Sequence, residues 1–204
     1  MSKAGKRGFS LLELLMAIAL LALLTAAGTW GGAAILRDWQ VRRAAHQLEE
    51  DLECAQRQTE QRGSVGLVNG RLLEQHSFLV FQPQGRSYTF YRWQDIDGNG
   101  VPDAGEAVAL WDRSLPPGID FGWTADVDRR ACSNPIGLPG RAVTFARPDY
   151  PPCHDRPCIK FDSLGTSVIG PGAVYLSNGS QSFALSLTRP GVLTICRWNG
   201  SKWQ

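Results

Sequence analysis

The chain has 204 residues, of which 43% are hydrophobic and 20% are charged. This mixture is typical of a globular protein and excludes a chain that is disordered throughout. The formal net charge is +2, but Lys3, Lys6 and Arg7 all precede Gly8, and without these three charges the remainder carries −1. A body this close to neutral argues against a broad surface for nucleic acid or anionic lipid.

The N-terminus combines a short basic start with a long apolar segment. The segment FSLLELLMAIALLALLTAAG extends from Phe9 to Gly28 and contains one charge, Glu13. A helix of this length matches a hydrocarbon core of about 30 Å. Basic residues before a membrane span stay in the cytoplasm. The sequence therefore predicts a membrane-spanning helix at residues 9–28, with the rest of the chain exported.

Three other kinds of segment share this pattern. They are a secretory signal peptide cut near Thr25-Ala26-Ala27, an uncleaved signal anchor and a buried core helix. None of them accounts for Glu13, because a carboxylate inside an apolar span is costly unless it has a partner.

The residues around the start of the apolar segment are Lys6-Arg7-Gly8, then Phe9, and then Glu13 as the fifth residue after Gly8. This arrangement resembles the class III leader of type IV pilins and pseudopilins. The resemblance implies that a prepilin peptidase cuts between Gly8 and Phe9, removing residues 1–8, and that Phe9 becomes an N-methylated amine. Glu13 would then neutralise the Phe9 amine of a neighbouring subunit, because two opposite charges in low dielectric are tolerable together and costly alone.

The same resemblance implies partners and a location. The partners are the prepilin peptidase, other pilins or pseudopilins of the same filament, and an inner-membrane assembly platform. The expected location is the inner membrane, spanned once, with a cytoplasmic N-terminus and a periplasmic C-terminal domain.

Apolar residues at helical spacing continue beyond the expected span. They are Val41, Ala44, Ala45, Leu48, Leu52 and Ala55. This periodicity predicts an amphipathic continuation of the helix through residues 29–63, with Gly63 as its stop. Cys54 lies close to the apolar face, and we expect it to be the unpaired cysteine.

After Gly63 the pattern changes to short apolar runs separated by turn residues, which is typical of antiparallel sheet. Strands are expected at 64–68, 77–81, 88–93, 107–111, 142–146, 159–162, 173–176, 183–187 and 192–198. The Asn-Gly pairs at 69–70, 178–179 and 199–200 predict tight turns. Residues 112–158, rich in Pro and Gly, are expected to form a long irregular excursion. The predicted fold class is α+β, with a long N-terminal helix packed on an antiparallel β domain at 64–204.

Three further segments carry a second resemblance. They are AAHQLEEDLECAQRQTEQRGSV at 44–65, IKFDSLG at 159–165 and RPGVLTICRW at 189–198. They look like the minor pseudopilins of the GspH/FimT family, whereas residues 112–158 have no clear counterpart there. This resemblance implies a place at or near the tip of a type II secretion filament or a type IV pilus.

Residues 95–106 fit the twelve-residue calcium-loop template, with Gly100 at the sixth position. Side-chain oxygens fall at its ligand positions, which are occupied by Asp95, Asp97, Asn99, Asp103 and Glu106. Together with the carbonyl of Val101 they would surround one Ca²⁺. The flanking residues read as strands rather than as the helices of an EF-hand, and Pro102 is unusual in such a loop, so a solvated acidic turn is the alternative.

The chain has five cysteines, and an odd number leaves at least one unpaired within the monomer. In an exported domain we expect disulfides among Cys132, Cys153, Cys158 and Cys196, with three connectivities open. Zinc held by Cys153, His154 and Cys158 is the alternative, although its ligand set is incomplete.

The sequence contains no catalytic signature of a nucleophile elbow, phosphate loop, dinucleotide fingerprint or zinc protease. We therefore expect a structural subunit rather than an enzyme. The second hypothesis is a binding module displayed on a filament, either an adhesin or a DNA-uptake subunit. In that case Arg189, Arg197 and Lys202 would contact phosphate.

Overall fold

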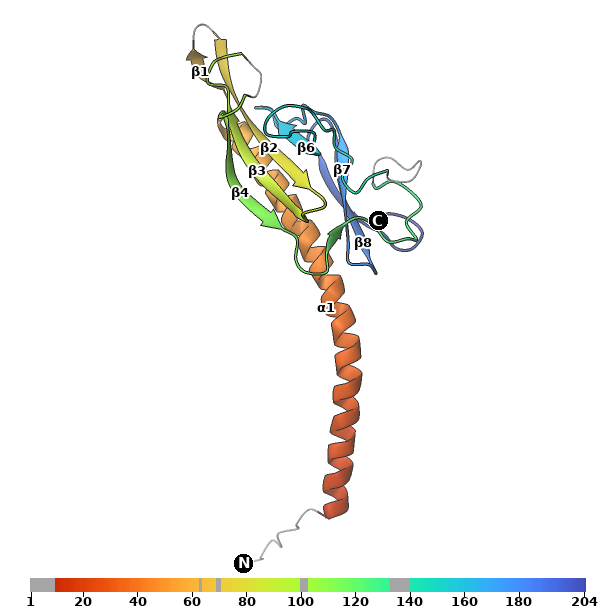
Figure 1. Cartoon of the computed structure of the whole chain (residues 1–204). Helices are drawn as coiled ribbons and strands as arrows, with labels where there is room; N and C mark the ends of the chain where they lie inside the picture. Colours follow the sequence, from red (N-terminus) through yellow and green to blue (C-terminus); the bar gives the residue numbers. More distant parts are fainter. Residues whose placement is uncertain (1–9, 63, 69–70, 100–102, 133–139) are drawn as a thin grey trace, which may run out of the picture. The chain divides into compact units, whose positions relative to one another are not determined.

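The structure, a computed structural model, describes residues 10–62, 64–68, 71–99, 103–132 and 140–204. Within these ranges, residues 26–34, 62 and 64–74 are described by their backbone alone. Contacts divide the chain into a first unit, Met1–Trp39, and a second unit, Gln40–Gln204. The predicted α+β class with antiparallel sheets is confirmed (Figure 1).

Helix α1 (Leu11–Arg62) has 52 residues and begins in the first unit. The carbonyl of Ser10 accepts its first helical hydrogen bond from the N–H of Leu14, at 3.1 Å, so Ser10 occupies the N-cap position. Ten large apolar side chains between Leu11 and Leu24 are each at least 55% exposed. This part of α1 is therefore apolar on all sides, unlike a surface helix with a single apolar stripe.

Within the part of the chain that the structure describes, no helix is long and apolar enough to cross a membrane, so the membrane span expected at residues 9–28 stays a prediction.

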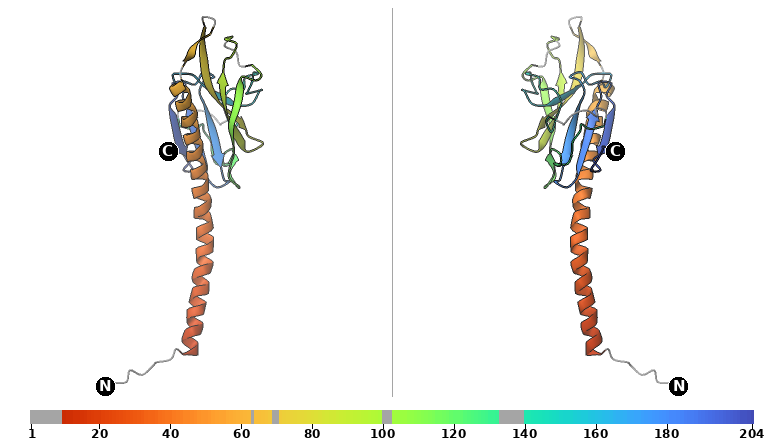
Figure 2. Two further views of the ribbon diagram at one scale, coloured as in Figure 1. Left: turned by 90° about the vertical axis from the view of Figure 1, so that its left-hand side faces the viewer. Right: turned by 90° about the vertical axis from the view of Figure 1, so that its right-hand side faces the viewer.

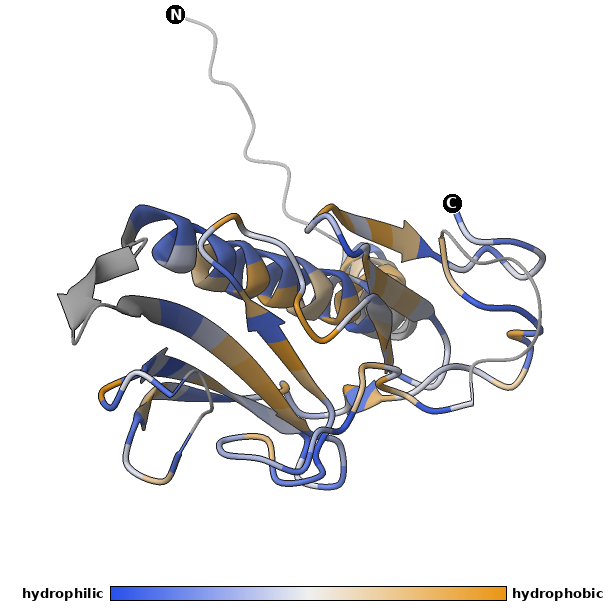
Figure 3. Ribbon diagram, turned by 90° about the horizontal axis from the view of Figure 1, so that it is seen from above, coloured by the Kyte–Doolittle hydropathy of each residue, from blue (hydrophilic) through white to orange (hydrophobic). Residues whose placement is uncertain are grey.

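In the second unit, α1 is amphipathic as expected. All six predicted core positions are at most 5% exposed, and they are Val41, Ala44, Ala45, Leu48, Leu52 and Ala55. Hydrophobic and hydrophilic bands alternate along this part of α1 (Figure 3). The expected helix stop, Gly63, lies outside the described residues, and α1 ends at Arg62.

The first sheet is antiparallel and has five strands. Its main path runs β1 (Ser64–Val68), β2 (Arg71–Gln82), β3 (Ser87–Gln94) and β4 (Ala107–Ser114). Strand β6 (Cys158–Phe161) pairs with the second half of β2, opposite Ser77–Val80. Strand β2 is longer than its predicted core at 77–81, because its first half pairs with β1.

The second sheet is also antiparallel, in the order β5-β7-β8-β9. Its strands are β5 (Asp120–Phe121), β7 (Gly172–Ser177), β8 (Ser182–Leu187) and β9 (Leu193–Arg197). The turn between β7 and β8 contains the predicted Asn178-Gly179 pair, and Gly179 has a φ of 82°, which glycine adopts without steric cost. The Asn-Gly pair at 69–70 lies outside the described residues.

The main core lies between α1 and the inner faces of both sheets (Figure 2). The buried face of α1 packs with side chains of β2, β3, β6, β7 and β8, among them Leu79, Phe90, Ile159, Val174 and Leu185. Every residue of β8 is buried. Part of its outer face is also covered, because Ala184 packs with Ala131, Tyr175 and Cys196 in a smaller cluster.

Two expectations for residues 112–158 need correction. The strand predicted at 142–146 is wrong, because this segment makes only one isolated bridge, between Val143 and Val174. Pairing stops there because the Thr144 hydroxyl, rather than a backbone carbonyl, accepts from the Ala173 N–H, at 2.7 Å. The excursion also contains β5, which was not predicted because two residues are too few to show an alternating pattern.

Candidate functional site

The residues expected at the processing site are only partly described. Gly8 and Phe9 lie outside the described residues. Glu13 lies in the first turn of α1, where the helix dipole favours a negative charge. Its side chain is exposed among exposed leucines, and the described residues offer it no ion-pair partner. A cation from another molecule can therefore reach this carboxylate.

The acidic loop lies between β3 and β4, as the flanking residues predicted. Carboxylate oxygens of Asp95, Asp97 and Glu106 all lie within 4.8 Å of one another. Ca²⁺ binds oxygen at about 2.3–2.6 Å, so one ion placed between these groups could contact all three. The structure thus brings together three of the six predicted ligands.

The remaining predicted ligands stand differently. The side-chain amide of Asn99 donates to Asp97 and to Asp103, both at 2.8 Å, so hydrogen bonds link these three exposed side chains. The N–H of Gly98 donates to Asp95 Oδ1 at 2.7 Å, which fixes the first carboxylate of the loop. Val101 lies outside the described residues.

Glu106 is held in place at the end of the loop and is 8% exposed. Its carboxylate accepts hydrogen bonds from the Trp93 indole at 3.0 Å, from Ile96 N–H at 2.8 Å and from Asp103 N–H at 3.0 Å. Burial alone raises the pKa of Glu106. The hydrogen bonds from Asp103, Trp93, Ile96 and the Asp97 backbone outweigh it and leave the pKa below its ordinary value. The glutamate is therefore ionised at neutral pH, as a metal ligand must be.

The four expected cysteines form two disulfides, Cys132–Cys196 and Cys153–Cys158. Their Cα atoms lie 6.0 Å and 5.8 Å apart, within the usual range. The zinc alternative is wrong, because Cys153 and Cys158 are bonded to each other and supply no thiolate. Cys54 is free, as predicted.

With this geometry in place, comparison with known proteins adds one finding. Residues 3–29 match the model of the prokaryotic N-terminal methylation motif. The match covers the basic start, Gly8, Phe9 and Glu13, and it supports a type IV pilin-like protein. Such a leader implies cleavage by a prepilin peptidase and assembly with other pilins. No curated protein and no solved structure matches the chain, so membership of the GspH/FimT family stays a prediction.

Of the three basic residues expected to contact phosphate, only Arg189 lines a cavity in the part of the chain that the structure describes. Arg189 lines a cavity together with Arg130 and Arg141, whereas Arg197 and Lys202 are not among its lining residues. Sequence reasoning missed Arg130 and Arg141 because they lie in the irregular segment 112–158, where no periodicity indicates which residues meet.

Proposed function

We propose that the chain is a structural minor pilin or minor pseudopilin of the GspH/FimT type. It would serve a type IV pilus or a type II secretion system, without catalytic activity of its own. One observation carries the proposal. The start of α1, which lies within the match to the methylation motif at residues 3–29, is apolar on every described side, exposed, and marked by a single carboxylate.

The exposed apolar surface needs a partner. Burial of a leucine or isoleucine side chain contributes about 1.5–3 kcal/mol, and ten large apolar side chains between Leu11 and Leu24 are exposed. Before assembly the inner membrane would cover residues 9–28, with the C-terminal domain in the periplasm. In the filament, the same helices of other subunits would replace the lipid.

Processing would supply the counter-charge for Glu13. Cleavage between Gly8 and Phe9 by a prepilin peptidase creates a new amine at Phe9, which is then methylated. Either charge alone is costly in an apolar surrounding, and together they are tolerable. A pair between Glu13 of one subunit and the Phe9 amine of the next would therefore fix the register of neighbouring helices above the assembly platform.

The role of Glu13 can be tested by substitution in a host with a complete filament system. Glu13→Gln should leave cleavage and membrane insertion unchanged, because a neutral side chain does not oppose insertion. It should remove the chain from sheared filaments, because a neutral side chain cannot pair with the Phe9 amine. Glu50→Gln is the matched control, since Glu50 is exposed on the same helix outside the apolar segment. Incorporation of the Glu13→Gln chain at the level of the control would refute the proposed pairing.

We further propose that the loop 95–106 binds one structural Ca²⁺. The converging carboxylates of Asp95, Asp97 and Glu106 support this proposal. Their mutual repulsion would be relieved by the ion, which would stiffen the connection between β3 and β4.

Of the two hypotheses drawn from the sequence, the structural subunit takes precedence, because the exposed apolar start of α1 supports it. The filament-displayed binding module would be an additional property of the same domain.

A further inference from the structure

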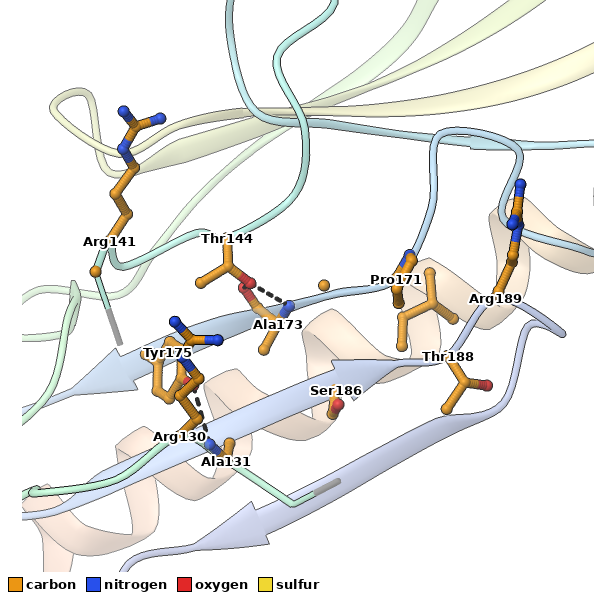
Figure 4. Close-up of a pocket in the computed structure, with 13 residues that line it drawn as sticks. Arg130, Ala131, Arg141, Thr144, Pro171, Ala173, Tyr175, Ser186, Thr188 and Arg189 are labelled. Atoms are coloured by element: carbon orange, nitrogen blue, oxygen red, sulfur yellow. Dashed lines mark hydrogen bonds between the residues drawn. The ribbon is translucent and has the colours of Figure 1, made fainter. Parts of the chain in front are cut away.

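A cavity of about 590 Å³ lies on the second sheet, on the face that does not pack against α1 (Figure 4). Strand residues alternate between faces, so Val174 and Leu185 point into the main core while Ala173, Tyr175 and Ser186 line the cavity. This volume falls in the range of about 300–1,000 Å³ typical of ligand sites.

The cavity is rich in positive charge. Arg130, Arg141 and Arg189 all line it, and none of the described residues lining it is acidic. Figure 4 shows Arg189 at one end, with Arg130 and Arg141 toward the other. Because the whole body beyond Gly8 carries only −1, three arginines around one cavity are a local concentration of charge rather than part of a basic surface.

The floor of the cavity adds a fixed polar group. Tyr175 is 1% exposed, and its hydroxyl accepts a hydrogen bond from the Ala131 N–H at 3.0 Å. Burial raises the pKa of Tyr175, and the opposing effects of the Ala131 N–H and of Arg130 do not cancel this. The phenol therefore keeps its proton at neutral pH, and its hydroxyl holds the Ala131 backbone next to Arg130.

A disulfide holds one wall of this cavity. Cys132 follows Arg130 and Ala131 in the chain and is bonded to Cys196 on β9, 64 residues later. Covalent attachment limits the freedom of the Arg130 backbone relative to the sheet. Without the disulfide, Arg130 would lie on an exposed loop and could move away from the cavity into solvent.

We propose that this cavity binds an acidic segment of a partner polypeptide, whose carboxylates pair with Arg130, Arg141 and Arg189. Guanidinium groups bind carboxylates through two parallel hydrogen bonds, and arginine clusters are a recurring means of recognising acidic motifs. The aliphatic part of the lining, with the exposed Pro171, suits the methylene groups of such a segment.

Nucleic acid fits the cavity less well. Sites for single strands combine positive charge with open aromatic faces on which bases stack. Here the aromatic lining residue, Tyr175, is buried against Trp123 and Trp203, at centroid distances of 5.6 and 5.8 Å. The proposal does not depend on incorporation into a filament, because it concerns the second unit alone.

The test uses the full chain in detergent micelles and fluorescence anisotropy with three labelled probes. The first is a peptide of alternating Glu and Gly, the second has Gln in place of Glu, and the third is an oligothymidylate of the same net charge as the first. The Glu peptide should bind and the Gln peptide should not. Combining Arg130→Gln, Arg141→Gln and Arg189→Gln should weaken binding of the Glu peptide at least tenfold.

A matched control separates the site from general charge. Arg147→Gln, Arg197→Gln and Lys202→Gln change the net charge equally at exposed positions outside the cavity lining, and should weaken binding less than threefold. Tyr175→Phe removes one hydroxyl and should cost threefold to tenfold. Thermal unfolding of each variant checks that the fold is intact.

Three outcomes would overturn the proposal. They are no binding of the Glu peptide at millimolar concentration, equal losses in the two triple variants, and tighter binding of the oligothymidylate through the same three arginines. Reduction of the disulfides should weaken binding of the Glu peptide in the native chain. Unchanged binding after reduction would contradict the role of the Cys132–Cys196 bond in holding this wall of the cavity.

Discussion

Asp51 connects α1 to the first sheet, and its replacement offers a quantitative test of how the helix is attached. Asp51 is 5% exposed, and its carboxylate accepts hydrogen bonds from the Tyr88 hydroxyl and from Arg113 Nε, both at 2.7 Å. A second guanidinium nitrogen of Arg113 lies 3.3 Å from the other oxygen. The pKa of Tyr88 is raised, first by burial and then by this bond to Asp51, so the phenol remains a donor.

The size of the effect follows from burial. Removing one partner of a fully buried ion pair costs about 3–5 kcal/mol. The Arg113 side chain is 46% exposed and can be partly rehydrated, so we expect about 2–3 kcal/mol for Asp51→Ala. For a chain of this size that corresponds to a fall in Tm of roughly 4–12 °C.

The assay is urea unfolding of the full chain in detergent micelles, followed by tryptophan fluorescence. The Arg113 guanidinium lies 5.3 Å from the ring centre of Trp111, so the fluorescence of Trp111 should report on the disrupted contact between Arg113 and Asp51. Arg113→Ala and the double variant complete a thermodynamic cycle that isolates the pair. A loss below about 0.5 kcal/mol for Asp51→Ala, the range of ordinary surface changes, would refute the assigned role.

Three further predictions concern the second unit. Ca²⁺ should raise the Tm and Asp97→Asn should abolish this rise, with stabilisation of about 2.7 kcal/mol at a hundredfold excess over Kd; calorimetric titration showing no heat at millimolar Ca²⁺ would contradict a site. Gly191→Ala should destabilise by about 2–4 kcal/mol, because a Cβ at φ 90° meets the Gly165 carbonyl and Gln56, whereas Gly179→Ala, with open space around it, should cost about 1 kcal/mol; similar losses in urea unfolding would contradict this. Asp162 stabilises the fold when ionised, because hydrogen bonds from Thr166 and Leu164 outweigh burial and lower its pKa; the stability difference between the native chain and Asp162→Asn should therefore be full at pH 7 and shrink below about pH 4, and a difference independent of pH would exclude this role.

Periodic features were the ones that the sequence revealed. The buried positions of α1 repeat every three to four residues, and the apolar runs of β3, β7 and β8 have the length and turn signals of strands. Both patterns arise because one face of a regular element must be covered. The acidic loop was found for a related reason, since ligand spacing in a single loop is fixed by the chain itself.

Features that depend on distant segments were not revealed. The pairing of Cys132 with Cys196 spans 64 residues, and four cysteines allow three connectivities. Arg130, Arg141 and Arg189 line the same cavity only because an irregular segment folds over β7 and β8. Gln56 illustrates the same limit, since its amide donates to the carbonyls of Gly165 and Gly191 at 3.0 and 3.3 Å, two loops that its helical position does not indicate.

The attachment of α1 to the sheets matters for the proposed role in a filament. The first part of the helix would be held by neighbouring subunits, and the second part is held by the main core, by Asp51 and by Gln56. Force along the helix would therefore reach the globular unit through buried contacts rather than through a single loop.

The most direct test of the central claim is mass spectrometry of the N-terminus of the chain purified from membranes of its native host. The account predicts a protein that begins at Phe9, carries one methyl group on the terminal amine and retains Glu13. A protein that begins after Ala27 would contradict it, because the residue proposed to pair with a neighbouring subunit would then have been removed with the leader.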